Sequence, residues 1–150
     1  MARFTFDGLT LETARPTDEL LSAARAWTLQ DPDHRDTTPP EFWFEQRAGR
    51  ESYVLQDSSG LVFFFKLQGH ATGEVEMHIQ FPPPIDLDQR ARILRGLTKG
   101  LCWIERALAF RQVHTLFFVS KSATLIRFCE TRLGFKANGN RLEKQIPAAQ

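Results

Sequence analysis

The amino-acid sequence predicts a single α/β domain, residues 1–150, built around one sheet. Three observations lead to this prediction. A chain of 150 residues with 42% hydrophobic side chains suits one domain with one core. In some segments apolar and polar side chains alternate, as in strands. In others the apolar side chains recur every three or four residues, as in helices. The expected order is strand, two helices, three strands, helix, strand, helix and two strands, with no internal repeat or long linker.

The charge balance argues against several classes of partner. Lys and Arg number 19 against 18 Asp and Glu, and the basic residues are scattered, so we expect no nucleic-acid partner and no membrane partner. No stretch approaches the ~20 apolar residues of a membrane span, and residues 1–7 lack the apolar core of a signal peptide. Cys102 and Cys129 fall on different predicted helices and suit free thiols, which favours a reducing, cytoplasmic setting.

The first three elements follow from local signals. Residues 9–13 alternate apolar and polar side chains, which predicts a half-buried strand. Thr17 can cap a helix that runs to about Leu29 and carries acidic residues in its first turn. The run Thr38-Pro39-Pro40-Glu41 fits the capping box of a second, short helix that ends near Gly49.

Aromatic and polar residues gather around the start of this second helix. Phe42, Trp43 and Phe44 are adjacent and cannot all face one core, so we expect some of them to line a cleft or cover a loop. The preceding segment, 30–36, holds His34 among acidic residues. Because one histidine among acids has no recognised ligand spacing, the sequence predicts a solvated loop and no metal site.

The middle of the chain predicts three strands. Residues 52–56 and 61–67 read as a hairpin, and the continuous apolar run 61–65 indicates a strand buried on both faces. Residues 74–81 alternate apolar and polar side chains, which predicts one core face and one polar face. Three successive prolines, 82–84, end that strand because proline cannot donate to a ladder.

The C-terminal half predicts two helices and three strands. Asp86 or Asp88 opens the longest helix, whose leucines recur at three- and four-residue steps, and Gly96 and Gly100 indicate close approach to the sheet. Residues 113–119 form an apolar strand, a helix follows with Ser120 or Ser122 as its cap, and Gly134 ends it. A final hairpin turns at Asn138-Gly139 and returns over 140–146.

The run Thr124-Leu125-Ile126-Arg127-Phe128-Cys129-Glu130-Thr131-Arg132-Leu133-Gly134-Phe135, directly after the strand at 113–119, resembles the last helix of the GCN5-related N-acetyltransferases, the GNAT superfamily. The predicted order of elements matches that architecture over essentially the whole chain. The resemblance implies a GNAT-like α/β (α+β) domain with a central, mixed, mostly antiparallel sheet flanked by helices. It also implies acyl transfer from acetyl-CoA or another acyl-CoA to an amine acceptor, and it allows a homodimer. The strand at 74–81 is similar to that of a subgroup met in phage and prophage genomes.

The resemblance places the acyl-CoA in a wedge between two strands, the one before the long helix and its parallel neighbour. Here these are the strands at 74–81 and 113–119, and the backbone of Ile79, Gln80 and Phe81 would pair with the pantetheine arm.

The same resemblance places the pyrophosphate at the N-terminus of the long helix, where unpaired N–H groups and the helix dipole favour an anion. The aligned residues are Gln89, Arg90, Ala91 and Arg92, and they lack the glycines of the family motif. Arg90 and Arg92 would supply charged donors instead, or both are simply solvated.

Candidate catalytic residues lie on the polar face of the strand at 74–81. Many relatives carry a general base there, and Glu74, Glu76 or His78 would fill that role; the alternative is a solvated face of a half-covered strand. Cys129 stands where active relatives often have a tyrosine that protonates the departing thiolate, although cysteine is also a small core residue. Ser122 stands beside the expected cofactor where asparagine is common, and its expected role is helix capping.

The leading hypothesis is an N-acyltransferase whose amine acceptor enters past the loop 30–38 and contacts Trp43 and Phe44. The alternative is a catalytically inactive GNAT-fold module for ligand binding or protein interaction, since a fold does not fix an activity. The missing glycines, Cys129 and Ser122 favour that alternative.

Overall fold

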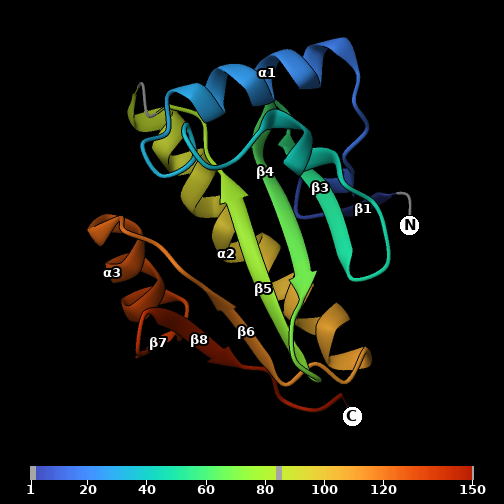
Figure 1. The fold of residues 1–150 in the computed structure, drawn as a ribbon, viewed down its shortest axis with the longest axis vertical. Coiled ribbons are helices and arrows are strands. Elements are labelled where there is room, and N and C mark those ends of the chain that lie inside the picture. Colours follow the sequence, from blue (N-terminus) through green and yellow to red (C-terminus); the bar gives the residue numbers. More distant parts are fainter. Residues whose placement is uncertain (1–2, 84–85, 150) are drawn as a thin grey trace.

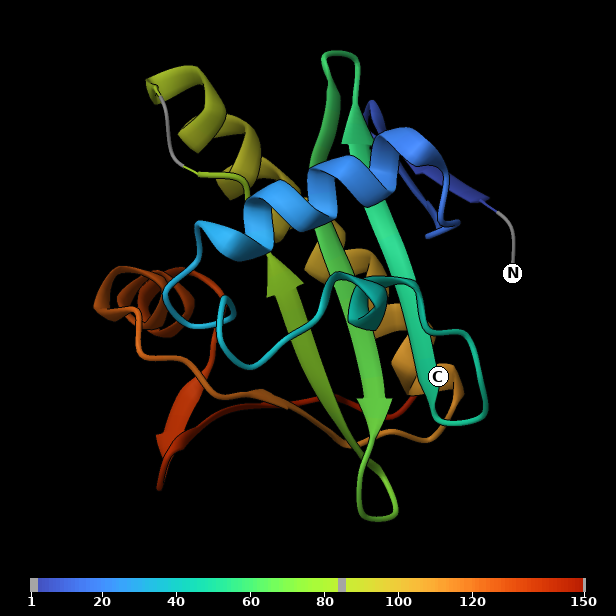
Figure 2. The ribbon, with the colours of Figure 1, turned by 45° about the horizontal axis from the view of Figure 1, so that its top comes forward.

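The computed structural model describes residues 3–83 and 86–149, which form one eight-stranded sheet with helices on both faces (Figure 1 and Figure 2). The helices are α1 (Asp18–Leu29), α2 (Leu87–Phe110) and α3 (Ala123–Arg132), and a short 3-10 helix, η1, spans Pro40–Phe44. The strands are β1 (Arg3–Phe6), β2 (Leu9–Thr13), β3 (Arg50–Asp57), β4 (Gly60–Gly69), β5 (Glu74–Gln80), β6 (Thr115–Phe118), β7 (Lys136–Asn138) and β8 (Arg141–Gln145).

The strand order in the sheet is β1-β2-β3-β4-β5-β6-β8-β7. Neighbouring strands are antiparallel except for β5 and β6, which run parallel with α2 as the connection between them. The predicted class, a mixed and mostly antiparallel sheet flanked by helices, is therefore confirmed. The continuous apolar run in β4 lies in the interior of the sheet, where both faces of the strand are covered.

Two hydrophobic clusters cover the two faces of the sheet. One face packs against α2 and α3 through residues such as Leu101, Ile104 and Cys129. The other face carries α1 and η1, which bury Trp43 against Val54 and Phe64. We call the side with α1 and η1 the front face.

The structure corrects two predictions about the N-terminal part. An additional strand, β1, pairs antiparallel with β2, and Asp7 and Gly8 turn the chain with positive φ. The second helix is a single 3-10 segment whose N-cap, Pro39, makes no side-chain cap hydrogen bond. The expected capping box at 38–41 is therefore wrong; two successive prolines leave few N–H groups for a cap to satisfy.

The remaining helix signals are confirmed. Thr17 accepts a hydrogen bond from the Leu20 amide at 3.2 Å, and the Asp86 carboxylate accepts one from the Gln89 amide at 2.8 Å. Gly134 adopts φ +79° just after α3. A Cβ at Gly96 would lie 2.7 Å from Leu55 Cδ2, which explains a glycine at this contact of α2 with the sheet.

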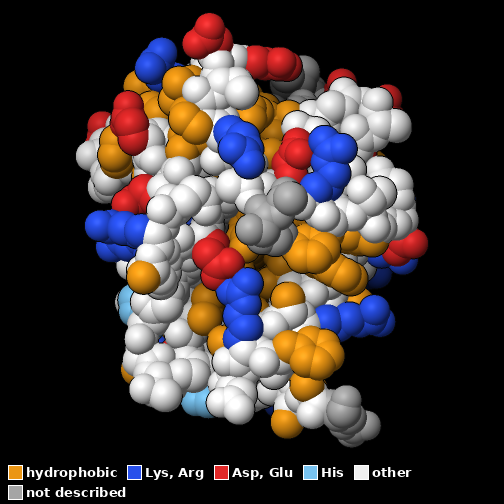
Figure 3. Space-filling model, turned by 90° about the vertical axis from the view of Figure 1, so that its right-hand side faces the viewer, with side chains coloured by type: hydrophobic (Ala, Val, Ile, Leu, Met, Phe, Trp, Pro, Cys, Tyr) orange, Lys and Arg blue, Asp and Glu red, His pale blue; other side chains and the backbone are white. Residues whose placement is uncertain are grey.

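The surface at the β1 edge of the sheet shows hydrophobic side chains interspersed with Lys and Arg and with Asp and Glu (Figure 3). Phe4 and Phe6 of β1 are half-buried, and their rings lie 5.0 and 5.6 Å from the Trp103 ring of α2. Across residues 3–83 and 86–149, no helix has the length and apolar character needed to cross a membrane. Both cysteines are free, as predicted; Cys102 is exposed and Cys129 is buried.

Candidate functional site

The parallel strands β5 and β6 separate along their length. They pair at only three positions, Glu74 with Thr115, Val75 with Leu116 and Glu76 with Phe117. Beyond Glu76 the strand β5 continues to Gln80 with β4 as its partner, so its other edge faces β6 without a ladder (Figure 2). Main-chain groups on such an edge need another partner. The predicted divergence of these two strands is therefore confirmed.

The predicted wedge residues contribute in different ways. The Ile79 side chain packs into the core, and the Phe81 ring lies 5.8 Å from the Phe63 ring. The Gln80 side chain is fully buried and points to the front face, where it contacts the loop before η1.

Glu76 lies on the front face at the point where the wedge opens. Its Oε1 atom is 2.6 Å from His70 Nε2 and 3.4 Å from His78 Nε2. The neighbouring His78 and, to a smaller extent, His70 lower the pKa of Glu76, although burial acts in the opposite direction. The two imidazoles outweigh the effect of burial, so the carboxylate is ionised at neutral pH.

The His78 side chain lies between this carboxylate and an aromatic ring. It is 25% exposed, and the Phe42 ring meets it edge to face with centroids 5.2 Å apart. Its Nε2 atom is buried and lies 3.4 Å from Glu76 Oε1 without forming a hydrogen bond to it. The His78 imidazole is therefore an ion-pair partner of Glu76 whenever it is protonated.

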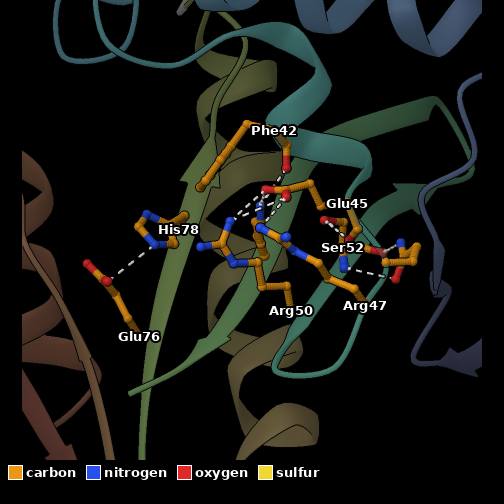
Figure 4. A network of polar contacts seen from close by, with 9 residues as sticks. Phe42, Glu45, Arg47, Arg50, Ser52, Glu76 and His78 are labelled. Carbon is orange, nitrogen blue, oxygen red and sulfur yellow. Dashed lines mark hydrogen bonds and ion pairs between the residues drawn. The ribbon is translucent and has the colours of Figure 1, made fainter. Parts of the chain in front are cut away.

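A basic and acidic cluster lies next to His78 in the sheet (Figure 4). Lys66 of β4 is the register partner of His78, and its side chain has no exposed surface. Its Nζ atom donates to the Phe42 carbonyl at 2.8 Å, forms an ion pair with Glu45, and lies 3.4 Å from the centre of the Phe42 ring. Burial lowers the pKa of Lys66, and the Lys66 ammonium lowers the pKa of Glu45.

A further charged side chain lies over the front face of β6, on the other side of Glu76. Phe117, the register partner of Glu76, carries the Arg141 guanidinium 3.8 Å above its ring. The Arg141 Nη1 atom lies 3.5 Å from Glu74 Oε1 and 3.8 Å from Glu143 Oε2. Glu74 therefore lies with the other front-face residues of β5, but at the closed end of the wedge.

The structure corrects the expected acceptor contacts. Trp43 has no exposed surface and belongs to the front-face core, so it cannot meet an acceptor; Phe44 is half-buried against Phe64. Phe42 is the aromatic residue of η1 that reaches His78. Three adjacent aromatics in a 3-10 segment necessarily point in different directions, and only the fold decides which one faces the site.

The loop before η1 is ordered by β5 rather than solvated. Gln80 accepts a hydrogen bond from His34 Nδ1 at 2.7 Å and donates to Asp31 Oδ2 at 3.0 Å, with the amide orientation fixed by its second donation to the Phe81 carbonyl. The His34 ring also packs against Trp43 at 5.5 Å. The prediction of a solvated loop is thus wrong for Asp31 and His34. No group of metal-ligating side chains occurs in the part of the chain that the structure describes.

At the N-terminus of α2, several donors are already used. The Asp86 carboxylate caps the helix, and Arg92 donates to both oxygens of Asp57, at 2.7 and 2.9 Å. Arg92 also reaches the Gly60 carbonyl at 3.2 Å, so it fixes the β3–β4 turn. Arg90 and Ala91 are exposed, and Gln89 is half-buried. Residues 84 and 85, which precede this helix in the sequence, lie outside the described residues.

Two residues of the last helix have clear structural roles. Ser122 caps α3 by accepting from the Leu125 amide at 3.3 Å, as predicted. Cys129 has no exposed surface, and burial raises the pKa of its thiol to about 12. A proton donor to a departing thiolate needs access to it, so this geometry favours the core role of Cys129 over the acid role.

Sequence reasoning brought Glu76 and His78 together correctly but missed the residues around them. The register of β4 with β5 places Lys66 beside His78, Glu45 pairs with Lys66, and His70 contacts Glu76. One signal was available. A lysine directly after the continuous apolar run of a central strand has to find a partner when it is buried.

Comparison with known proteins agrees with this architecture. No protein-family model matches the chain, and no curated protein matches it in sequence. Solved structures do match over nearly the whole chain. The ribosomal-protein-S18-alanine N-acetyltransferase from Escherichia coli superposes with a TM-score of 0.65 at 20% identity, covering 95% of this chain and 96% of that one.

Two further matches have the same extent. An aminoglycoside 6'-acetyltransferase type Ii has a TM-score of 0.66 at 15% identity, covering 93% of this chain and 99% of that one. A ribosomal L7/L12 alpha-N-protein acetyltransferase in complex with coenzyme A has a TM-score of 0.66 at 12% identity, covering 96% and 97%. With its splayed parallel strands, its two-sided helical cover and these matches, the chain has the fold of the GCN5-related N-acetyltransferases.

Proposed function

We propose that this protein is an acyl-CoA-dependent N-acyltransferase that transfers an acyl group, in the simplest case acetyl, to an amine. The observation that carries the proposal is the position of Glu76. It is the last residue of β5 that pairs with β6, so an ionised carboxylate with two imidazoles stands where the wedge opens. Acetyl-CoA or another acyl-CoA would lie in this wedge against the unpaired edge of β5.

In this proposal the acceptor amine approaches from the front face, between Phe42 and the β5 strand. Glu76, directly or through water, takes the proton from the ammonium group, and the neutral nitrogen attacks the thioester carbonyl. The N–C bond forms, the nitrogen releases its second proton to solvent, and the C–S bond breaks. Coenzyme A leaves as the thiolate, which takes a proton from solvent because Cys129 is buried. His78, whose Nε2 atom lies 3.4 Å from the Glu76 carboxylate, would orient the amine or share its proton.

Titration calorimetry with acetyl-CoA and coenzyme A tests the cofactor site first. Binding at micromolar ligand, with a matching rise in thermal stability, is expected, because a ligand that binds only the folded state stabilises it. Absence of binding at millimolar ligand would contradict the proposal.

Glu76→Gln tests the catalytic role. With acetyl-CoA and a panel of amines, we expect the variant to lose at least about a hundredfold in kcat, the usual range for a general base, while coenzyme A still binds. Unfolding curves of wild type and variant serve as the folding control. Equal rates for the two proteins would remove Glu76 from the mechanism.

A second candidate function is a GNAT-fold binding module without transferase activity. It is favoured by the N-terminus of α2, where Asp86 caps the helix and Arg92 is bound to Asp57. Both arrangements reduce the donors open to a pyrophosphate. The amine panel with acetyl-CoA separates the candidates, since a module of this kind would show no turnover with any amine although it is folded.

A further inference from the structure

The cluster beside His78 contains one carboxylate and three basic side chains. Glu45 pairs with Lys66, with Arg50 Nη1 at 3.2 Å and with Arg47 Nη2 at 3.1 Å (Figure 4). The next carboxylate across the sheet, Glu76, is held by His70. Within the described residues the cluster around Glu45 therefore keeps two positive charges without a matching negative charge.

A tight turn holds the two arginines on the same side of Glu45. The Arg47 amide donates to the Arg50 carbonyl at 3.0 Å, the Arg50 amide donates to the Arg47 carbonyl at 2.8 Å, and Gly49 adopts φ +81° between them. The two guanidinium groups differ in exposure, since Arg50 is 33% exposed and Arg47 is 61% exposed. Arg50 is thus the less solvated of the two arginines. Water and salt therefore screen an ion pair with a bound anion less at Arg50 than at Arg47.

The position of Arg50 in the sheet directs it toward the candidate catalytic residues. Arg50 pairs with Gln68 of β4, and Gln68 pairs with Glu76 of β5, so all three side chains share the front face. Neighbouring strands are about 4.8 Å apart, which puts the Arg50 and Glu76 backbones about 10 Å apart, within reach of one small molecule. Figure 4 shows the Arg50 guanidinium between Glu45 and the pair formed by Glu76 and His78.

The free donors of Arg50 fit an oxyanion. Its hydrogen bonds to Glu45 both use Nη1. Its Nε and Nη2 atoms have no hydrogen-bond partner in residues 3–83 and 86–149, and these two N–H groups form the planar edge that matches a carboxylate or phosphate.

We propose that Arg50 binds an anionic group of the acceptor, so that the acceptor is an amine that also carries a carboxylate or a phosphoryl group. The amine faces Glu76 and His78, and the anion faces Arg50 and neutralises part of the charge around Glu45. This inference rests on the proposed function for the identity of the amine, whereas the oxyanion subsite is a property of Arg50 itself. A simple alkylamine lacks the group that this subsite binds.

The test is an NMR titration of the ¹⁵N-labelled protein, with and without coenzyme A. The ligands are the ω-amino acids from glycine to 6-aminohexanoate, 2-aminoethylphosphonate, and alkylamines of matched length. We expect at least one anionic amine to bind tenfold or more tightly than its matched alkylamine, with shifts at Arg50 and Glu76. No preference for any anionic member would overturn the inference.

Arg50→Gln should remove that preference, weakening the anionic ligands tenfold or more and leaving the alkylamines unchanged. Arg47→Gln is the matched control, because it removes the same charge from the same carboxylate but from an exposed position. It should weaken the anionic ligands less than threefold. Equal losses of affinity in the two variants would mean that the net charge of the cluster determines binding. That result would overturn a direct contact between the anion and Arg50.

Arg50→Lys keeps the charge next to Glu45 and serves if Arg50→Gln does not fold. It is expected to lose several-fold in affinity for the anionic ligands, because an ammonium group lacks the planar edge. Affinity equal to that of wild type would overturn the planar contact. Weaker binding of coenzyme A itself in the Arg50 variants would assign the subsite to the cofactor and also overturn the proposal.

Binding and turnover fail separately in this design. Arg50-dependent binding of an anionic amine without acetylation would leave the subsite standing and remove the proposed transferase activity. Acetylation of alkylamines at the same kcat/KM as their anionic counterparts would support the transferase activity and overturn the anion subsite at Arg50.

Discussion

At the residue scale, the candidate site depends on one lysine that is buried in a sheet. Lys66 sits in the strand next to His78, and its ammonium group contacts the carbonyl and the ring of Phe42. It therefore joins η1 to β4 and holds Phe42 against His78. Buried ion pairs of this kind add little net stability, but removing one partner is costly when the other remains buried.

This asymmetry gives a prediction for the two partners. Glu45→Gln should lower the free energy of unfolding by about 2 kcal/mol, because Lys66 would stay buried with a charge and a weaker partner. Lys66→Met should change it by less than about 1 kcal/mol, since Glu45 is partly exposed and keeps Arg47 and Arg50. Urea unfolding of the two variants measures both, and a larger loss for Lys66→Met would contradict this account.

Glu76 gives a prediction for the pH dependence of stability. Its pKa in the folded protein lies below the ordinary value of 4.5, so the carboxylate contributes stability above that value and loses it as the pH falls through the folded pKa. Glu76→Gln should therefore show a shallower loss of stability below about pH 4.5, by at most the slope of one proton. Urea unfolding between pH 3 and 6 measures the slopes; parallel curves would speak against a lowered pKa.

At the element scale, the contact of α2 with the sheet positions the wedge. The helix connects the parallel strands β5 and β6, and its two glycines lie on the side that faces β3 and β4. Their surroundings differ. A Cβ at Gly96 would lie 2.7 Å from Leu55 and 3.1 Å from Phe63, whereas at Gly100 the nearest atom is 4.0 Å away.

The two glycines should respond with opposite signs to alanine. Gly100→Ala is expected to raise the free energy of unfolding by up to about 1 kcal/mol, the gain in helix propensity. Gly96→Ala should lower it by about 1 kcal/mol, because overpacking against the buried Leu55 exceeds that gain. Thermal unfolding compares them directly, and stabilisation by both would show that Leu55 moves aside freely.

At the scale of the whole molecule, the sequence predicted the order of elements well and their side-chain partners poorly. Periodicity located β4, β5 and α2 because it reports which face of an element is buried. It carries no information on which residue of one strand lies beside which residue of the next. The pairing of Lys66 with His78 could therefore not be foreseen, and neither could the row that joins Arg50 to Glu76.

The errors in the site have the same origin. The aromatic run 42–44 predicted that some of these side chains line a cleft or cover a loop. The direction of each one depends on the 3-10 turn, which buries Trp43 and turns Phe42 toward His78. The loop before it was expected to be solvated, because nothing local to Asp31 and His34 indicates that Gln80 will bind both.

The free cysteines have a practical consequence for spectroscopy. Cys129 is enclosed in the core, whereas Cys102 projects from α2 on the side of the sheet opposite to Phe42 and His78. Thiol-directed reagents act on the accessible thiolate, so the native protein offers a single attachment point at Cys102. A fluorophore or spin label on Cys102 would lie on the α2 side of the sheet. It would therefore not contact the charged side chains around Glu76 and Lys66 on the front face.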